Sequence, residues 1–201
     1  MADPANVVFY FGGFQSKQKD VDAWKASATE QEGDNFSFEA FPYPASATFE
    51  DVSAVKNFGA TKIDQLAKRI SDDKTRQYVI VGHSSGCAIA NAVAEKALDL
   101  EGGKAARNFR LIALDGFRPR QGLWGKIGIT CWSAKNGETK APNWKSMENS
   151  AKFNFYDACN CGTQAWCVHF SLVNENATAD TVKTIPQGYT NCKANLVWLK
   201  C

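Results

Sequence analysis

The sequence predicts an α/β fold in which helices cover both faces of a mainly parallel central sheet. Two observations predict it. Short apolar runs of strand length alternate with segments of helical periodicity in the first half of the chain. Most of these runs are apolar throughout, as expected for strands buried on both faces. With 201 residues, 44% of them hydrophobic and 22% charged, the chain fits a single domain over residues 1–201.

The first strand is expected over residues 6–11, where an apolar run ends at a pair of glycines. Polar residues with helix-compatible spacing then predict a helix over 17–28. In residues 36–41 apolar and polar residues alternate with a period of two, and a proline ends the pattern, which predicts a second strand. After a loop, apolar residues at spacings of three and four predict an amphipathic helix over 61–71.

The next strand is expected over residues 78–81, before a glycine-flanked turn and an alanine-rich helix over 87–98. Residues 110–114 form another apolar run, which ends at Asp115. Apolar strands separated by helices favour right-handed crossovers and hence parallel strands. The weaker patterns that follow predict strands over 127–132 and 152–156, a strand or strand-to-loop junction over 166–173, and a terminal element over 195–199.

The turn before the alanine-rich helix reads Gly82-His83-Ser84-Ser85-Gly86, a G-x-S-x-G pattern. A serine on a tight strand-to-helix turn adopts strained backbone angles, so the positions two before and two after it must be small. The turn also leaves the Ser85 backbone N–H free at a helix N-terminus, where negative charge is stabilised. The pattern predicts Ser84 as a nucleophile and Ser85 as an oxyanion-hole donor. The alternative is a polar turn that binds an anion.

A serine nucleophile needs an adjacent base, which is usually a histidine, and the chain has two histidines. The side chain of His83 is expected to point away from the Ser84 hydroxyl, because the two residues are neighbours on a tight turn. His169 is therefore the predicted base. The alternative is that His169 is a buried structural residue.

The carboxylate that orients the imidazole is predicted to be Asp115, because the carboxyl ends of parallel strands meet at one edge of a sheet. An Asp-Gly pair is also a common turn dipeptide. Glu138 and Asp157, which follow two later expected strands, therefore remain as alternatives.

With this turn and the order serine, acid, histidine, the chain resembles the α/β-hydrolase superfamily over residues 7 to about 173. The spacing from Ser84 to Asp115 and the segment that begins at His169 are similar to the thioesterase branch. The resemblance implies a second oxyanion-hole donor, the backbone N–H of Phe14, in the loop after the first strand. Such a mechanism requires no metal and no organic cofactor.

The charge balance, with 23 Lys and Arg against 21 Asp and Glu, argues against a nucleic-acid partner. Basic residues are in excess between residues 101 and 145, so a membrane surface is kept as an alternative partner. Segments 43–57 and 117–150 are the expected covers of the site. The second contains Trp124, Trp132 and Trp144, which fit either an acyl-binding surface or the local core. No partner protein is predicted.

Seven cysteines are more than a cytosolic enzyme of this size usually carries. Structural zinc is disfavoured, because there are only two histidines and no paired C-x2-C knuckles. Partial disulfide pairing is expected in the C-terminal third and would suit secretion, whereas the lack of a signal peptide favours the cytoplasm. The sequence therefore leaves the localisation open.

Taken together, these residues predict a serine hydrolase that cleaves a small-molecule or lipid acyl ester or thioester. The first alternative is a membrane-acting lipase or phospholipase, which the cysteines and the basic segment motivate. The second is a hydrolase-like fold that serves only as a binding module.

Overall fold

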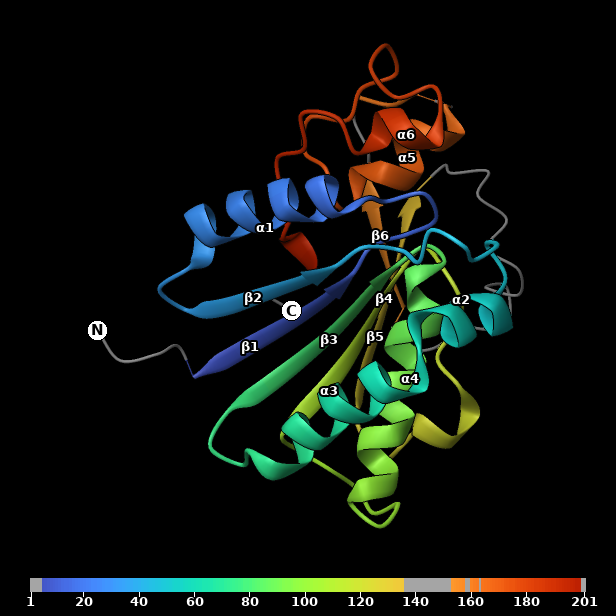
Figure 1. Cartoon of the computed structure of the whole chain (residues 1–201). Helices are drawn as coiled ribbons and strands as arrows, with labels where there is room; N and C mark the ends of the chain where they lie inside the picture. Colours follow the sequence, from blue (N-terminus) through green and yellow to red (C-terminus); the bar gives the residue numbers. More distant parts are fainter. Residues whose placement is uncertain (1–4, 136–152, 158–159, 163, 200–201) are drawn as a thin grey trace.

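The centre of the fold is a six-stranded sheet in the order β2-β1-β3-β4-β5-β6 (Figure 1). The computed structural model describes residues 5–135, 153–157, 160–162 and 164–199. Every neighbouring pair of these strands is parallel, which confirms the predicted sheet. The strands are β1 (Asn6–Phe11), β2 (Phe36–Phe41), β3 (Gln77–His83), β4 (Phe109–Leu114), β5 (Gly128–Lys135) and β6 (Phe153–Asp157).

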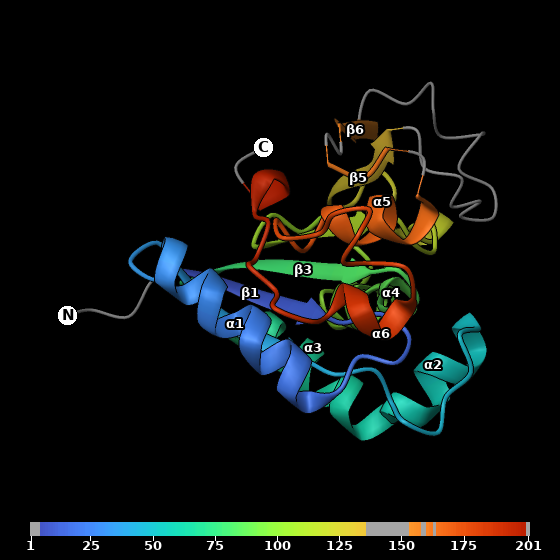
Figure 2. The ribbon, with the colours of Figure 1, turned by 90° about the horizontal axis from the view of Figure 1, so that it is seen from above.

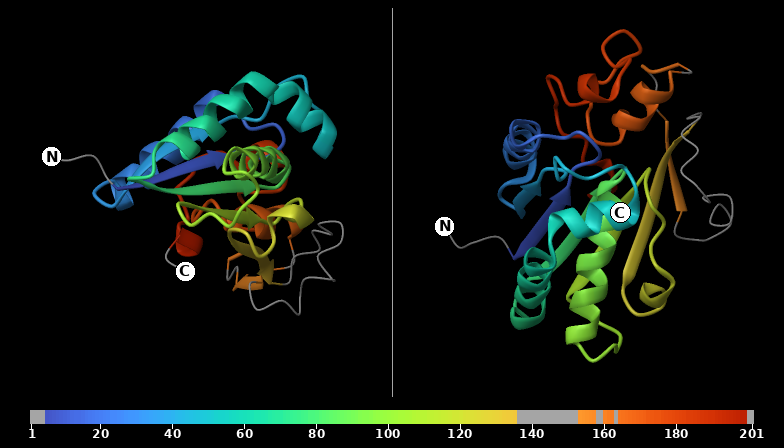
Figure 3. Two further views of the ribbon diagram at one scale, coloured as in Figure 1. Left: turned by 90° about the horizontal axis from the view of Figure 1, so that it is seen from below. Right: turned by 45° about the vertical axis from the view of Figure 1, so that its right-hand side comes forward.

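Helices cover both faces of the sheet, as predicted (Figures 1 and 3). α1 and the C-terminal segments pack on one face, and α2, α3 and α4 pack on the other. None of the helices in the described part of the chain is long and apolar enough to span a membrane. The helices are α1 (Gln18–Glu32), α2 (Asp51–Phe58), α3 (Ala60–Asp72), α4 (Gly86–Leu100), α5 (Ala165–Ser171) and α6 (Ile185–Gly188).

Strand β1 shows why the apolar runs of the sequence lack alternation. Val7, Phe9 and Phe11 belong to the core on the side of α2, α3 and α4. Val8 and Tyr10 belong to the core on the side of α1. All five side chains are at most 2% exposed, because both faces of this strand are covered.

The core on the α1 side is built from stacked aromatic rings. Trp24 of α1 stacks on Tyr10 of β1 with ring centroids 3.9 Å apart, and on Trp198 with centroids 6.3 Å apart. Trp198 lies in a 3-10 turn over Val197–Leu199. The terminal element expected from the sequence is therefore present, and it closes this face of the sheet.

The prediction for residues 166–173 was wrong, because this segment contains the helix α5. A short apolar run cannot be assigned to a strand or a buried helix from its periodicity alone. Cys167, Val168 and Phe170 are all at most 1% exposed. Because α5 is so deeply buried, its sequence lacks the polar residues at spacings of three and four that mark a surface helix. The sequence analysis also missed α2, which lies in the segment expected as a cover.

Two of the three tryptophans of the expected second cover belong to the core. Trp132 on β5 is 7% exposed and lies in the core on the α1 side. Trp124 is partly buried against the opposite core. Trp144 lies outside the described residues.

Candidate active site

The strand order changes direction at β1, which has β2 on one side and β3 on the other. In open parallel sheets such a point creates a crevice beyond the carboxyl ends of the strands. Helices α2, α5 and α6 surround this edge (Figure 2). The register pairs Phe11 with Gly82, so the loop after β1 runs beside the turn after β3. A Cβ added at Gly13 would lie 2.8 Å from Ser84 Cβ, so this close approach requires glycine.

Ser84 lies in the turn between β3 and α4 with φ of 54°, in the left-handed region. The two glycines of the motif allow helix and strands to approach closely. A Cβ at Gly82 would lie 2.4 Å from Cys87 Cα, and a Cβ at Gly86 would lie 2.3 Å from the Phe11 carbonyl oxygen. Larger residues at either position would push α4 away from the sheet. The strained serine turn predicted by the motif is therefore present.

Asp115 and His169 meet at the same edge of the sheet. His169 Nδ1 donates a hydrogen bond of 2.6 Å to Asp115 Oδ2, and these side chains are 6% and 0% exposed. The Ser133 hydroxyl donates to the other carboxylate oxygen at 2.9 Å. Because Leu114 pairs with Trp132 in the β4–β5 register, Asp115 and Ser133 are the next positions on the two chains. The carboxylate is thus held by groups from β5 and α5.

The Asp115-Gly116 turn packs directly on the serine turn. Asp115 has φ of 44°, and a Cβ added at Gly116 would lie 2.0 Å from the Ser84 carbonyl oxygen. Of the two alternative acids, Asp157 ends the edge strand β6 and is exposed, and Glu138 lies outside the described residues. The hydrogen bond from the imidazole goes to Asp115.

His83, the second histidine, is fully buried behind the site. Its Nε2 lies 3.1 Å from the carbonyl oxygen of His169, and because a carbonyl only accepts, this nitrogen carries the proton and donates. The two imidazole rings lie 4.5 Å apart between centroids. Burial, followed by the charge of His169, lowers the pKa of His83 to about 3. His83 is therefore neutral, and it holds the backbone of the predicted base.

A cavity of about 320 Å³ opens above these groups. Its walls are mostly aromatic, so it offers an apolar surface next to a hydroxyl and an imidazole. Within the described part of the chain, no hydrogen bond joins the Ser84 hydroxyl to His169, a bond that is often long in free enzymes and tightens when substrate binds. The lining residues are Phe14, Phe49, Ser84, Ser85, Trp166, His169, Phe170, Ile185 and Tyr189.

Two backbone N–H groups are available beside the serine. Among the residues that the structure describes, neither the Phe14 N–H nor the Ser85 N–H has a hydrogen-bond partner. Ser85 directly precedes helix α4, so its N–H lies at the positive end of the helix dipole. The Tyr189 hydroxyl donates to the Phe14 carbonyl oxygen at 3.1 Å and holds this loop in place. The predicted oxyanion-hole residues therefore line one cavity with Ser84.

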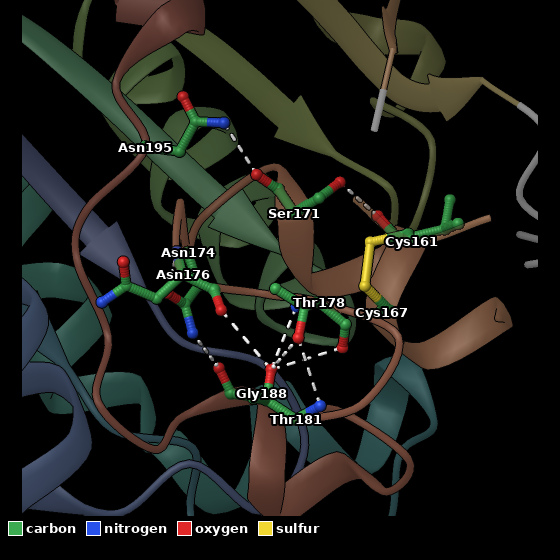
Figure 4. Close-up of a disulfide and its surroundings, with 10 residues drawn as sticks. Cys161, Cys167, Ser171, Asn174, Asn176, Thr178, Thr181, Gly188 and Asn195 are labelled. Carbon is green, nitrogen blue, oxygen red and sulfur yellow. Dashed lines mark hydrogen bonds between the residues drawn. A yellow bond between two sulfur atoms is a disulfide. The ribbon is translucent and has the colours of Figure 1, made fainter. Parts of the chain in front are cut away.

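The helix that carries His169 is fastened at both ends (Figure 4). A disulfide joins Cys161 to Cys167, two residues before the histidine, which agrees with the expected partial pairing. At the other end, the Asn195 side chain donates to the Ser171 carbonyl oxygen at 2.7 Å. The C-terminal segment thus fixes the position of α5 against the sheet.

The remaining cysteines take no visible part in the site. Cys87 and Cys131 are free and buried, and Cys192 is free and half-buried. Cys159 and Cys201 lie outside the described residues. Over 5–135, 153–157, 160–162 and 164–199, no group of three or more His, Cys, Asp or Glu side chains is arranged to hold a metal ion.

The sequence analysis missed several residues that shape the site. Ser133 carries no motif, and only the strand register brings it to the carboxylate. Tyr189 lies close in space to the loop after β1 but far from it in sequence. Phe49 and Trp166 are exposed apolar residues, and they lie just before α2 and within α5, two helices that the sequence did not predict.

Comparison with solved structures of similar topology identifies the fold. A thioesterase of the prodiginine biosynthetic pathway in Streptomyces coelicolor superposes with a TM-score of 0.50 at 16% identity, over 77% of each chain. This chain has the α/β-hydrolase fold. No family model and no curated protein matches its sequence.

Two further structures with the α/β-hydrolase fold align at lower scores. The catalytic core of an acetyl xylan esterase from Trichoderma reesei has a TM-score of 0.44 and 15% identity, over 78% of this chain and 84% of that one. A proposed hydrolase of the α/β superfamily from Xanthomonas campestris has a TM-score of 0.41 and 17% identity, over 75% and 86%. At such identities the likeness concerns the fold alone, because one fold carries many activities.

Proposed function

We propose that this protein is a serine hydrolase that cleaves an acyl ester or thioester. One observation carries the proposal: a single cavity exposes Ser84, on a left-handed turn, together with His169, whose imidazole is bonded to the buried Asp115. Nucleophile, base and orienting acid are the groups that covalent acyl transfer requires.

In the acylation step, the Ser84 hydroxyl oxygen attacks the substrate carbonyl carbon. His169 Nε2 takes the hydroxyl proton, since Nδ1 is already engaged with Asp115. The N–H groups of Ser85 and Phe14 stabilise the oxyanion that forms. The carbon–oxygen or carbon–sulfur bond then breaks, and the leaving group takes the proton from His169.

Water completes the cycle. It attacks the acyl-Ser84 carbonyl carbon while its proton passes to His169, and the acid leaves as the Ser84 oxygen regains that proton. The Asp115 carboxylate holds the imidazole in one tautomer and stabilises its protonated form. The neutral His83 donor adds no positive charge next to this transient cation.

The walls of the cavity support an apolar acyl group. A water-sized volume is about 30 Å³, so a cavity of about 320 Å³ accommodates on the order of ten heavy atoms. The printed name of one structure with this fold, a thioesterase, is in line with acyl chemistry.

A fluorophosphonate probe tests the nucleophile directly. The native protein should form one adduct, on Ser84, and the matched variant Ser37→Ala on β2 should label equally. Ser84→Ala should remain unlabelled, and it should turn over p-nitrophenyl hexanoate about a millionfold more slowly. His169→Ala should lose both labelling and turnover. A folded native protein with no adduct and no turnover would instead favour a binding module.

A lipase that acts at a lipid surface is a second candidate, because apolar side chains are exposed at the cavity mouth. Phe49 is 62% and Trp166 39% exposed, and both line the cavity. Val52, which lies on α2 three residues after Phe49, is 79% exposed. A lipase would show a jump in rate when the concentration of an ester substrate exceeds its critical micelle concentration. Phe49→Ser should reduce that jump. A smooth saturation curve counts against this candidate.

A further inference from the structure

A second and larger hollow adjoins the cavity that contains Ser84. It is a groove of about 1280 Å³, and Phe14 lines both spaces. Ile185, which begins α6, and Tyr189, which directly follows it, line the cavity, and the residue after each of them lines the groove. A substrate whose carbonyl carbon lies at Ser84 can therefore extend past Phe14 into the groove.

The groove is lined by three lysines and one acidic residue. Lys17, Lys19 and Lys62 contribute the positive charges, and Asp20 is the acid. The Asp20 carboxylate accepts a hydrogen bond of 2.8 Å from the Lys17 backbone N–H, so it caps helix α1. In the described part of the chain, none of the three lysines takes part in an ion pair. With three lysines and one aspartate, the side chains that line the groove carry a net positive charge.

Two helices begin at this groove and add to its positive potential. Lys19 lies in the first turn of α1, and Lys62 lies in the first turn of α3. The first N–H groups of a helix attract anions. The first turn of α3 contains no acidic residue.

The remaining walls of the groove are largely apolar. Phe41, Phe58 and three alanines line it, and Lys62 Nζ lies 5.5 Å from the centre of the Phe58 ring. A ligand that fits these walls combines an apolar or neutral stem with an anionic group. The groove is several times larger than the cavity, so the part of the substrate that it holds is larger than the acyl group.

We propose that the groove binds the leaving group of the substrate, and that this leaving group carries phosphate. The proposal rests on the serine hydrolase function above. Phosphate suits the site because one phosphate carries up to two negative charges and lysine binds it as a point charge. Such a leaving group is either a phosphorylated thiol, as in coenzyme A thioesters, or the glycerophosphate part of a lysophospholipid.

Two thioesters with the same acyl group test the proposal. Hexanoyl-coenzyme A carries phosphates, and S-hexanoyl-N-acetylcysteamine has the same reacting bond without them. The double variant Lys19→Glu/Lys62→Glu reverses two charges, and its new carboxylates lie in first turns where helices favour acids. The control Lys25→Glu reverses one charge on α1 outside the groove.

The double variant should raise KM for hexanoyl-coenzyme A roughly tenfold at low ionic strength, with kcat unchanged, and the effect should shrink in high salt. KM for the neutral thioester should stay the same, and Lys25→Glu should change neither value. An equal change with both substrates, or no change with either, overturns the proposal. Lysophosphatidylglycerol serves as a third substrate. If the double variant raises KM more for this lipid than for hexanoyl-coenzyme A, the phosphate belongs to a lipid. The opposite order assigns it to a phosphorylated thiol.

Calorimetry with free coenzyme A separates this proposal from the proposed function. Binding needs no catalysis, so the native protein should bind coenzyme A and the double variant should bind it about tenfold more weakly. If the neutral thioester is not hydrolysed and no serine is labelled, the hydrolase function fails. Calorimetry then still shows whether the groove binds the phosphates of coenzyme A. If the neutral thioester is hydrolysed and coenzyme A does not bind, the hydrolase stands and the groove proposal fails.

Discussion

Acid is expected to destabilise the folded protein through His83. Burial and the neighbouring His169 lower the pKa of His83 from its ordinary 6.5 to about 3. Between these pH values the unfolded chain binds a proton on this side chain that the folded chain does not, so the free energy of unfolding decreases as pH falls. The decrease is a little over 1 kcal/mol per pH unit and roughly 5 kcal/mol over the full range. Because His83 is fully buried, solvent does not screen this effect.

Urea unfolding at pH 7, 6, 5 and 4 measures this decrease in the free energy of unfolding, with the variant His83→Gln as the reference. The glutamine amide N–H can donate to the His169 carbonyl oxygen as the imidazole does, and it does not titrate. Titrating groups far from His83 cancel in the difference between the two proteins. The stability of the native protein relative to the variant should therefore fall by about 3 kcal/mol between pH 7 and pH 4. Parallel pH profiles would refute the reasoning, because the folded protein would then protonate His83 freely.

Three further substitutions test the positioning of the site. Asp115→Asn should lower kcat on p-nitrophenyl hexanoate about ten-thousandfold, because an amide can hold His169 in the wrong tautomer; an unchanged kcat would exclude this carboxylate as the triad acid. Gly86→Ala should cost about 1–3 kcal/mol in urea unfolding and reduce fluorophosphonate labelling, since its Cβ would lie 2.3 Å from the Phe11 carbonyl oxygen; full labelling would contradict this. Cys161→Ser should cost about 2 kcal/mol by loss of a short disulfide loop, and a reductant should lower the thermal unfolding midpoint less in this variant than in the native protein.

Most of the parallel sheet was predictable from local sequence. Strands buried on both faces, such as β1, leave uninterrupted apolar runs, and amphipathic helices such as α3 leave spacings of three and four. The prediction failed at α5, where a short and deeply buried helix has the same apolar pattern as a strand. It also missed α2, whose eight residues give too little periodicity to count as a helix.

The position of Ser84 on its turn followed from the sequence alone, because a strained backbone depends on residues close to it in sequence, here Gly82 and Gly86, two positions to either side. The partner of His169 was decided by the tertiary structure. Asp115 lies 54 positions away along the chain, and the two side chains meet only because β4 ends at the carboxyl edge that α5 covers. The two hollows around Phe14 likewise arise from loops that converge in space. Turn geometry depends on neighbours in sequence, whereas hydrogen bonds between distant side chains and the shape of a binding site depend on strand register and on the path of the loops.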